Sequence, residues 1–204
     1  MITAKEALER LKEGNRRFVA RLNSGDTTLP GPRLELTSQQ NPFAIILGCS
    51  DARVPAEIVF EQGLGDLFVI RVAGNIVASS QVGSIEFAAS RFGTRLVVVL
   101  GHSQCGAIRA TIEQLQQPVE NQSRHLRSIV DRVRPSVEAL LNTELRNDTE
   151  QLARLAVRTN VSVSVSHLRY GSAVLEQLIR DNGLCVVGAE YSLETGVVEF
   201  FDNL

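Results

Sequence analysis

Residues that commonly bind transition metals follow two short apolar runs of the chain, each of which ends in glycine. Cys49 follows the run 45–48, and His102 and Cys105 follow a second run. Two thiolates and one imidazole suit a tetrahedral zinc ion, and three protein ligands leave the fourth position open for water or substrate. The pattern predicts one Zn2+ ion per subunit. The alternatives are a closed zinc site without chemistry, or free cysteines and an unrelated histidine.

An acidic and a basic residue accompany the first of these cysteines. Asp51 and Arg53 flank one position and can face each other across a tight turn, where a carboxylate and a guanidinium often form a bidentate pair. A plain salt bridge is the simplest interpretation. Beside an open zinc site, Asp51 could instead occupy the fourth coordination position or accept a hydrogen bond from zinc-bound water, with Arg53 holding the carboxylate away from the metal. We therefore predict a catalytic role for both residues.

The remaining cysteine and histidines lie in different surroundings. Cys185 lies in a short β-branched run, where a small buried hydrophobic residue is expected. His125 and His167 lie in helical patterns among charged or polar neighbours, which favours surface positions. Three cysteines are too few for a disulfide framework and indicate a reducing compartment or metal chemistry.

Short apolar runs are expected to form the strands that position the metal ligands. Continuous rather than alternating runs are typical of parallel strands buried on both faces, and they occupy 43–47, 67–72, 96–100 and 184–188. Functional groups in open parallel sheets gather beyond the carboxyl ends of the strands. The sheet would therefore bring Cys49 and His102 to the same rim.

Helical patterns separate these runs, which predicts an α/β fold with a central, mostly parallel sheet flanked by helices. A capping box of Thr3 and Glu6 opens an N-terminal helix, and 24–41 reads as an irregular connection. A closing run could add a C-terminal antiparallel edge strand. The expected helices occupy 55–62, 80–92, 107–116, 123–141, 148–167 and 172–182, and Pro135 would kink or break the helix at 123–141. The expected edge strand occupies 196–201.

Composition limits the classes of function. The 204 residues, 44% of them hydrophobic, suffice for one domain with a continuous core. The net charge of -2 gives no electrostatic reason to bind nucleic acid or anionic lipid. The N-terminus lacks the apolar core of a secretory signal, and no apolar run approaches the roughly 20 residues of a membrane span. We expect a cytoplasmic protein with no nucleic acid or membrane partner.

Four motifs resemble those of the β-class carbonic anhydrases, in the order and at the spacing of that family. They are Cys-Ser-Asp-Ala-Arg-Val-Pro at 49–55, Phe-Val-Ile-Arg-Val-Ala-Gly-Asn at 68–75, Gly-Ser-Ile-Glu-Phe at 83–87 and Gly-His-Ser-Gln-Cys-Gly-Ala at 101–107. The resemblance, which extends from about residue 3 to the C-terminus, implies zinc-dependent reversible hydration of carbon dioxide to bicarbonate and a proton, by attack of zinc-bound hydroxide. It implies zinc binding by Cys49, His102 and Cys105, and catalysis by Asp51 and Arg53.

The resemblance also implies a substrate pocket and an oligomer. Gln40 matches a glutamine that hydrogen-bonds substrate across a dimer interface, and Gly106 matches a glycine whose backbone amide faces the substrate. Phe68, Val72 and Phe87 would supply a small apolar pocket for carbon dioxide. The chain is thus expected to be one β-carbonic anhydrase domain over 1–204 and to form a homodimer or a homotetramer. Residues 1–40 would form a helical arm for dimerisation with its loop, and 41–204 the zinc-binding α/β core.

One departure concerns regulation. The subgroup with an inhibitory bicarbonate site has a tryptophan three residues before the first zinc cysteine, whereas this chain has Ile46 there and contains no tryptophan. We therefore expect a plant-like member without that site, although Arg71 and Tyr191 match its bicarbonate-contacting residues.

Other activities are compatible with the same residues. Hydrolysis of carbonyl sulfide or carbon disulfide can use the same fold and zinc site. A catalytically silent, zinc-stabilised interaction module would need none of Gln40, Asp51 and Arg53. Redox sensing through Cys49 and Cys105 is a weaker alternative, because zinc-bound thiolates in a reducing cell are usually shielded.

Overall fold

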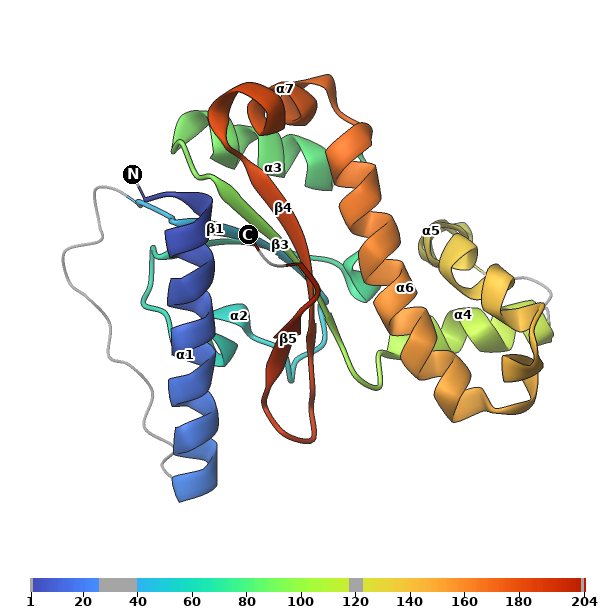
Figure 1. Ribbon diagram of the computed structural model, residues 1–204. Helices are drawn as coiled ribbons and strands as arrows, with labels where there is room; N and C mark the ends of the chain where they lie inside the picture. The colour runs from blue at the N-terminus through green and yellow to red at the C-terminus, as the bar shows by residue number, and fades with distance from the viewer. Residues whose placement is uncertain (1, 26–39, 118–122, 203) are drawn as a thin grey trace.

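One five-stranded sheet forms the centre of the protein (Figure 1). The computed structural model describes residues 2–25, 40–117, 123–202 and 204. The strand order is β2-β1-β3-β4-β5, in which the first four strands are parallel and the last is antiparallel to β4. The strands are β1 (Ala44–Gly48), β2 (Leu67–Arg71), β3 (Leu96–His102), β4 (Cys185–Tyr191) and β5 (Val198–Phe200). The predicted α/β fold is confirmed.

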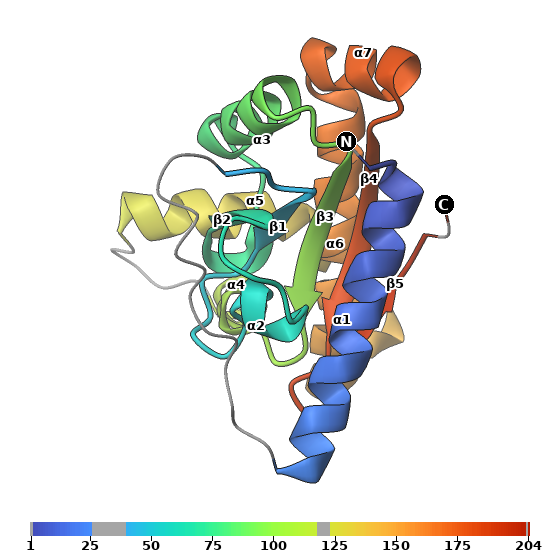
Figure 2. The ribbon, with the colours of Figure 1, turned by 90° about the vertical axis from the view of Figure 1, so that its left-hand side faces the viewer.

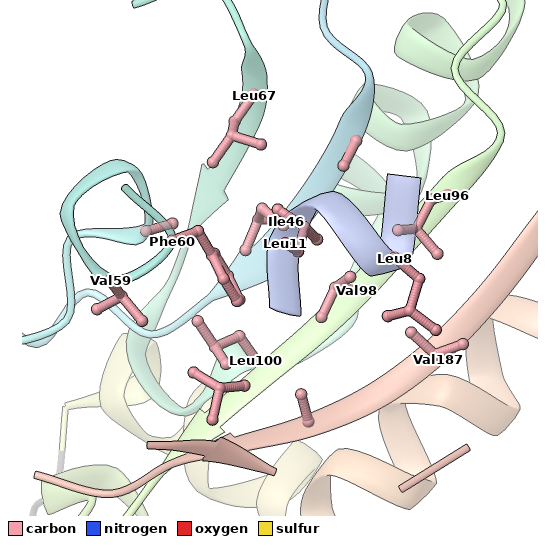
Figure 3. Close-up of a cluster of buried hydrophobic side chains, with 14 of the residues drawn as sticks. Leu8, Leu11, Ile46, Val59, Phe60, Leu67, Leu96, Val98, Leu100 and Val187 are labelled. Carbon is pink, nitrogen blue, oxygen red and sulfur yellow. The ribbon is translucent and has the colours of Figure 1, made fainter. Parts of the chain in front are cut away.

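Helix α1 (Ala4–Ser24) covers one face of the sheet, together with the short helix α2 (Ala56–Val59) (Figures 1 and 2). The predicted capping box is present: the Glu6 amide donates to Thr3 Oγ1 at 3.2 Å, and the Thr3 amide donates to the Glu6 carboxylate at 2.7 Å. Figure 3 shows Leu8 and Leu11 of α1 pointing toward the sheet. They pack in one buried cluster with residues of β1, β3 and β4: Ile46, Val98, Leu100 and Val187.

Helices α3 (Ser79–Arg91), α6 (Thr149–Tyr170) and α7 (Ala173–Asn182) cover the opposite face. Their apolar residues contact the side chains of β1 and β3 that alternate with those facing α1, so both strands are buried on both faces. Burial on both faces explains the continuous rather than alternating apolar runs in the sequence.

Helices α4 (Gly106–Gln116) and α5 (Arg124–Leu141) pack with α6 around a third apolar cluster, which includes Cys49 and Cys105. In Figure 1, α6 stands between the sheet and these two helices. Two short 3-10 helices complete the described elements, η2 (Ala73–Asn75) and η3 (Glu144–Asn147). Because the third cluster adjoins the carboxyl ends of β1 and β3, three helices enclose the rim where the ligands were expected.

The predicted elements are found with small shifts at their ends, and one of them needs correction. The predicted helix at 55–62 is reduced to α2, because Glu61 adopts a left-handed backbone with φ 47° that cannot continue the helix. Of the two alternatives for Pro135, the break is absent because α5 continues through this residue, and the kink stays a prediction. Proline has no backbone N–H to donate to the carbonyl group one helical turn earlier. Because Pro135 is exposed, water can donate to that carbonyl group instead. Most of the connection predicted at 24–41 lies outside the described residues.

Among the described helices, none combines the length and the apolar character that crossing a bilayer requires.

Gly14 allows α1 to lie against the end of α2. A Cβ atom at this position would lie 1.8 Å from the carbonyl oxygen of Phe60, far inside van der Waals contact. The neighbouring Asn15 fixes the same approach, since its side-chain amide donates to the carbonyls of Val59 at 3.1 Å and Gly196 at 2.8 Å. The helix therefore docks by backbone proximity as well as by apolar contact.

We predict that Gly14→Ala lowers the free energy of unfolding by about 1–3 kcal/mol, because α1 must move away from α2. Gly83→Ala is the matched control within α3. Its Cβ would meet nothing within 4 Å, so the higher helix propensity of alanine should raise stability by about 0.5–1 kcal/mol. Urea unfolding of both variants at one protein concentration measures the two signs. Equal effects of the two substitutions would contradict the close approach.

Candidate metal centre

The three predicted ligands converge at the carboxyl ends of two neighbouring strands. The potential ligand atoms of Cys49, His102 and Cys105 all lie within 4.8 Å of one another, and all three residues are buried. Cys49 directly follows β1, His102 is the last residue of β3, and Cys105 is the N-cap of α4. Because β1 and β3 are paired in parallel, both ligand-bearing segments leave the sheet at the same rim.

His102 is oriented for metal binding. Its Nδ1 lies 2.8 Å from the carbonyl oxygen of Ser103, which favours the tautomer that donates from Nδ1 and leaves a lone pair on Nε2. Nε2 is buried, yet it has no hydrogen-bond partner among the described residues. A buried polar atom without a partner costs free energy, and a metal ion would remove that cost. The donor set and the free nitrogen both fit zinc.

The two thiols affect each other's ionisation. A hydrogen bond from the Cys105 thiol lowers the pKa of Cys49, with further contributions from His102 and from the backbone amides of Gly74 and Asp51. The same hydrogen bond to Cys49, together with burial, raises the pKa of Cys105. A cation between the sulfur atoms would favour the loss of both protons. The cluster is therefore suited to a divalent ion.

Asp51 and Arg53 form the predicted bidentate pair beside the cluster. Arg53 donates from Nε to Oδ1 of Asp51 at 2.9 Å and from Nη2 to Oδ2 at 2.8 Å, and its backbone amide also donates to Oδ1 at 3.0 Å. These hydrogen bonds hold the pKa of the Asp51 carboxyl well below its usual range. Oδ2 of Asp51 lies 3.9 Å from Nε2 of His102. An ionised carboxylate therefore borders the ligand cluster while Arg53 engages both of its oxygens.

Arg71 anchors the loop that carries Cys49 and Asp51. Its guanidinium donates from Nε to the carbonyl oxygen of Cys49 at 2.9 Å and from Nη2 to the carbonyl oxygen of Asp51. In the sequence analysis, this arginine was matched only to a bicarbonate-contacting residue. Its position at the end of β2, next to β1 in the sheet, is what allows it to hold the loop.

Glu194 anchors the loop that carries the other two ligands, a role that the sequence analysis missed. Its carboxylate accepts hydrogen bonds from Ser103 Oγ at 2.8 Å and from Gln104 Nε2 at 2.7 Å, which lower its pKa to about 2. Gln104 has a positive φ of 56°, an unfavourable conformation for this residue type. Glu194 lies in the turn between β4 and β5, and no local sequence pattern connects it to a loop 90 residues earlier.

The five predicted substrate residues divide into two groups. Val72 donates its amide to Gly48 O at 3.1 Å and packs in the apolar cluster that contains Cys49. Gly106 begins α4 directly after Cys105, and a Cβ atom at this position would meet nothing within 4 Å. These two lie next to metal ligands.

Phe68, Phe87 and Gln40 are not placed beside the ligands of their own chain. Phe68 pairs in register with Ile45, four residues before Cys49, which corresponds to roughly 13 Å along the strand. Its ring packs instead against those of Phe87 and Phe92, with centroid distances of 6.3 and 6.1 Å. Gln40 is exposed. Roles in the substrate pocket for these three residues stay predictions.

The other cysteine and the other histidines lie outside the cluster. Cys185 begins β4 and is half-buried rather than fully buried as expected, because it lies at the end of the strand. His125 and His167 are exposed, as predicted.

Comparisons with known proteins agree on one family. The family model described as carbonic anhydrase matches residues 44–198. A carbonic anhydrase of Mycolicibacterium smegmatis is 39% identical over 202 residues, which cover 97% of this chain and 93% of that protein. Carbonic anhydrase 2 of Mycobacterium tuberculosis is 37% identical over 198 residues, with the same coverage of 97% and 93%.

Solved structures share the fold at lower identity. The β-carbonic anhydrase CafA of Aspergillus fumigatus superposes with a TM-score of 0.74 at 23% identity and covers 92% of this chain and 87% of its own. Tetrameric β-carbonic anhydrases of Sordaria macrospora give a TM-score of 0.72 at 22% identity, with 81% and 83% of the two chains covered. At these identities the likeness concerns the fold alone.

We predict that the protein binds one divalent transition metal ion per chain, and that Cys49→Ala and Cys105→Ala each lose it on dialysis. Two remaining ligands bind such an ion far more weakly than three. Cys185→Ala is the matched control, because it removes a thiol outside the cluster and should keep a full equivalent. Elemental analysis together with circular dichroism measures metal content on folded protein. Stoichiometric metal in Cys49→Ala would rule out this site.

Proposed function

The chain belongs to the β-class carbonic anhydrase family, and from this premise we propose that it catalyses the reversible hydration of carbon dioxide at a zinc ion held by Cys49, His102 and Cys105. The observation that carries the proposal is the buried Nε2 of His102, which has no hydrogen-bond partner among the described residues and lies near two thiols and 3.9 Å from Oδ2 of Asp51. A purely structural zinc site would not need an ionised carboxylate fixed at 3.9 Å from a ligand atom.

Zinc at this site would supply a Lewis acid that lowers the pKa of bound water to about 7 and stabilises negative charge on the substrate. The chain's own residues determine what surrounds that ion. Two thiolates donate more charge than imidazoles do, which opposes the ionisation of water. The hydrogen bonds from the backbone to Cys49, together with the positive charge of Arg53, act against that effect.

Asp51 accepts a hydrogen bond and thereby orients its donor in this scheme. Its carboxylate stays ionised because Arg53 stabilises the charged form, so Asp51 can only accept hydrogen bonds. Oδ2 is the oxygen nearer His102, and it is available to accept a hydrogen bond from the reacting water. The bidentate contact with Arg53 keeps the carboxylate from becoming a fourth ligand. Arg53 thus sets the position of the acceptor rather than contacting the water itself.

A second copy of the chain completes the substrate pocket in this proposal. Among the described strands, β2 pairs with β1 only, so one of its edges is open. Beside that edge, Phe87 of α3 is 54% exposed and packs with Phe68 and Phe92 in an aromatic cluster. An open edge next to an exposed aromatic surface is typical of an interface. Phe68, Phe87 and Gln40, which lie apart from their own chain's ligands, would then line the site of the partner.

The absence of an inhibitory bicarbonate site remains part of the proposal. Ile46, which stands at the position of the subgroup's tryptophan, is buried under α1. Arg71 already donates to two carbonyl groups of the ligand loop, which reduces its capacity to bind an anion.

Asp51→Ala should lower kcat for carbon dioxide hydration by about 100-fold or more, because it removes the hydrogen-bond acceptor that orients the reacting water beside the metal. Asp131→Ala is the control: this aspartate forms an ion pair on the exposed surface of α5 and should leave the rate unchanged. Stopped-flow hydration at neutral and mildly alkaline pH, on zinc-quantified protein, provides the measurement. If zinc-loaded protein does not hydrate carbon dioxide, carbonyl sulfide is the next substrate to assay. Inactivity on both substrates would favour a catalytically silent, zinc-stabilised interaction module.

Phe87→Lys should weaken the association of two copies of the chain, so that monomer appears at concentrations where the wild type is a dimer. A central aromatic residue of an interface contributes about 2 kcal/mol or more, so association should weaken by roughly 30-fold or more. Tyr170→Lys is the matched control, since Tyr170 is an aromatic residue with 75% exposure at the end of α6, outside the β2 edge. Sedimentation velocity reports the mass of each variant. If Phe87→Lys keeps the wild-type mass, the interface lies elsewhere, and a wild-type tetramer would indicate that two dimers pair.

A further inference from the structure

A strained turn lies directly beside the first metal ligand. The backbone amide of Gly74 in η2 donates to Sγ of Cys49 at 3.4 Å. Gly74 and Asn75 both have positive φ angles, 69° and 43°, and the buried Nδ2 of Asn75 has no hydrogen-bond partner among the described residues. Such a conformation persists only when the surrounding structure holds it in place.

Helix α6 holds this turn with two buried polar side chains. Asn160 Nδ2 donates to the carbonyl oxygen of Gly74 at 2.8 Å. One helical turn later, Ser164 Oγ donates to the carbonyl oxygen of Asn75 at 3.1 Å. Asn160 is itself contacted by Ser136 of α5, whose Oγ lies 3.4 Å from Oδ1. Asn160 and Ser164 are only 2% and 4% exposed, so these hydrogen bonds are largely shielded from water.

The opposite side of the turn is closed by packing. A Cβ atom at Gly74 would lie 3.1 Å from Cβ of Ala107 in α4 and 3.4 Å from Cγ2 of Val133 in α5. The turn is therefore confined between the apolar residues of α4 and α5 and the polar residues of α6. Its amide can keep its direction toward Cys49 only while this arrangement is intact.

We propose that Asn160 is a positioning residue of the metal centre. By holding the Gly74 carbonyl, it fixes the turn whose amide donates to Cys49, and so controls how strongly that sulfur binds the metal and how much charge it transfers. An N–H···S hydrogen bond withdraws electron density from a thiolate, which leaves the metal a stronger Lewis acid. This inference rests on the proposed zinc site.

The test compares two buried asparagines that bind backbone groups. Asn160→Ala removes the support of the turn. Asn15→Ala is the matched control, because Asn15 is 5% exposed and bridges α1 to Val59 and Gly196, on the face of the sheet covered by α1. Two readouts are measured on each protein: the rate of zinc release to an excess of chelator, and the sulfur-to-metal charge-transfer band after replacement of zinc by cobalt(II).

In Asn160→Ala, zinc release should be about 10- to 100-fold faster than in the wild type, because Cys49 is no longer held in its ligand position and this loss outweighs the stronger donation of its thiolate. The charge-transfer band should move to longer wavelength, because the thiolate is more electron-rich without the hydrogen bond. Asn15→Ala should be less stable than the wild type but unchanged in both readouts. If Asn160→Ala does not fold, Ser164→Ala takes its place, with smaller changes expected in the same directions.

Release rates and bands of the Asn160 or Ser164 variant that match those of Asn15→Ala would overturn the positioning role and leave only a structural one. Wild-type protein that binds no zinc would instead contradict the proposed function.

Discussion

The rest of the structure depends on one constraint: two thiols and an imidazole must lie within 4.8 Å of one another in a buried place. Flexible loops alone would not hold three such groups together. Ordering the loops costs conformational entropy, and the protonation of each group depends on that of its neighbours. The fold meets this requirement by placing the ligands at the ends of β1 and β3, two central strands that are buried on both faces. The neighbouring helices then enclose the rim.

Each ligand-bearing loop is held by a group from another part of the chain. Arg71 at the end of β2 holds the carbonyl group of Cys49, and the η2 turn supported by α6 donates to its sulfur. Glu194 in the β4–β5 turn holds the loop between His102 and Cys105. The ion pair of Asp51 and Arg53, by contrast, is built entirely from the local loop. The geometry of the candidate ligands is thus a property of the whole fold, whereas the proposed catalytic pair is local.

This difference explains how much of the site could be predicted from the sequence. Cys49, Asp51, Arg53, His102 and Cys105 are found because each lies within a few residues of an apolar strand that fixes its direction. Glu194 and Asn160 are missed because their hydrogen bonds join residues about 90 positions apart, a relation that no periodicity records. The strands were predicted well because burial on both faces gives a simple pattern. The extent of α2 was not, because it depends on the backbone of one residue, Glu61.

The dependence on Glu194 has a consequence for biosynthesis. The chain emerges from the ribosome in order, so the three candidate metal ligands are synthesised before β4 and the turn that holds their loop. Until Glu194 has been added, Gln104 has no carboxylate to hold its left-handed backbone. A nascent chain that ends before this turn therefore carries all three candidate ligands but not the fixed loop. At the proposed metal site, the final geometry must follow the synthesis of β4 and of the turn after it.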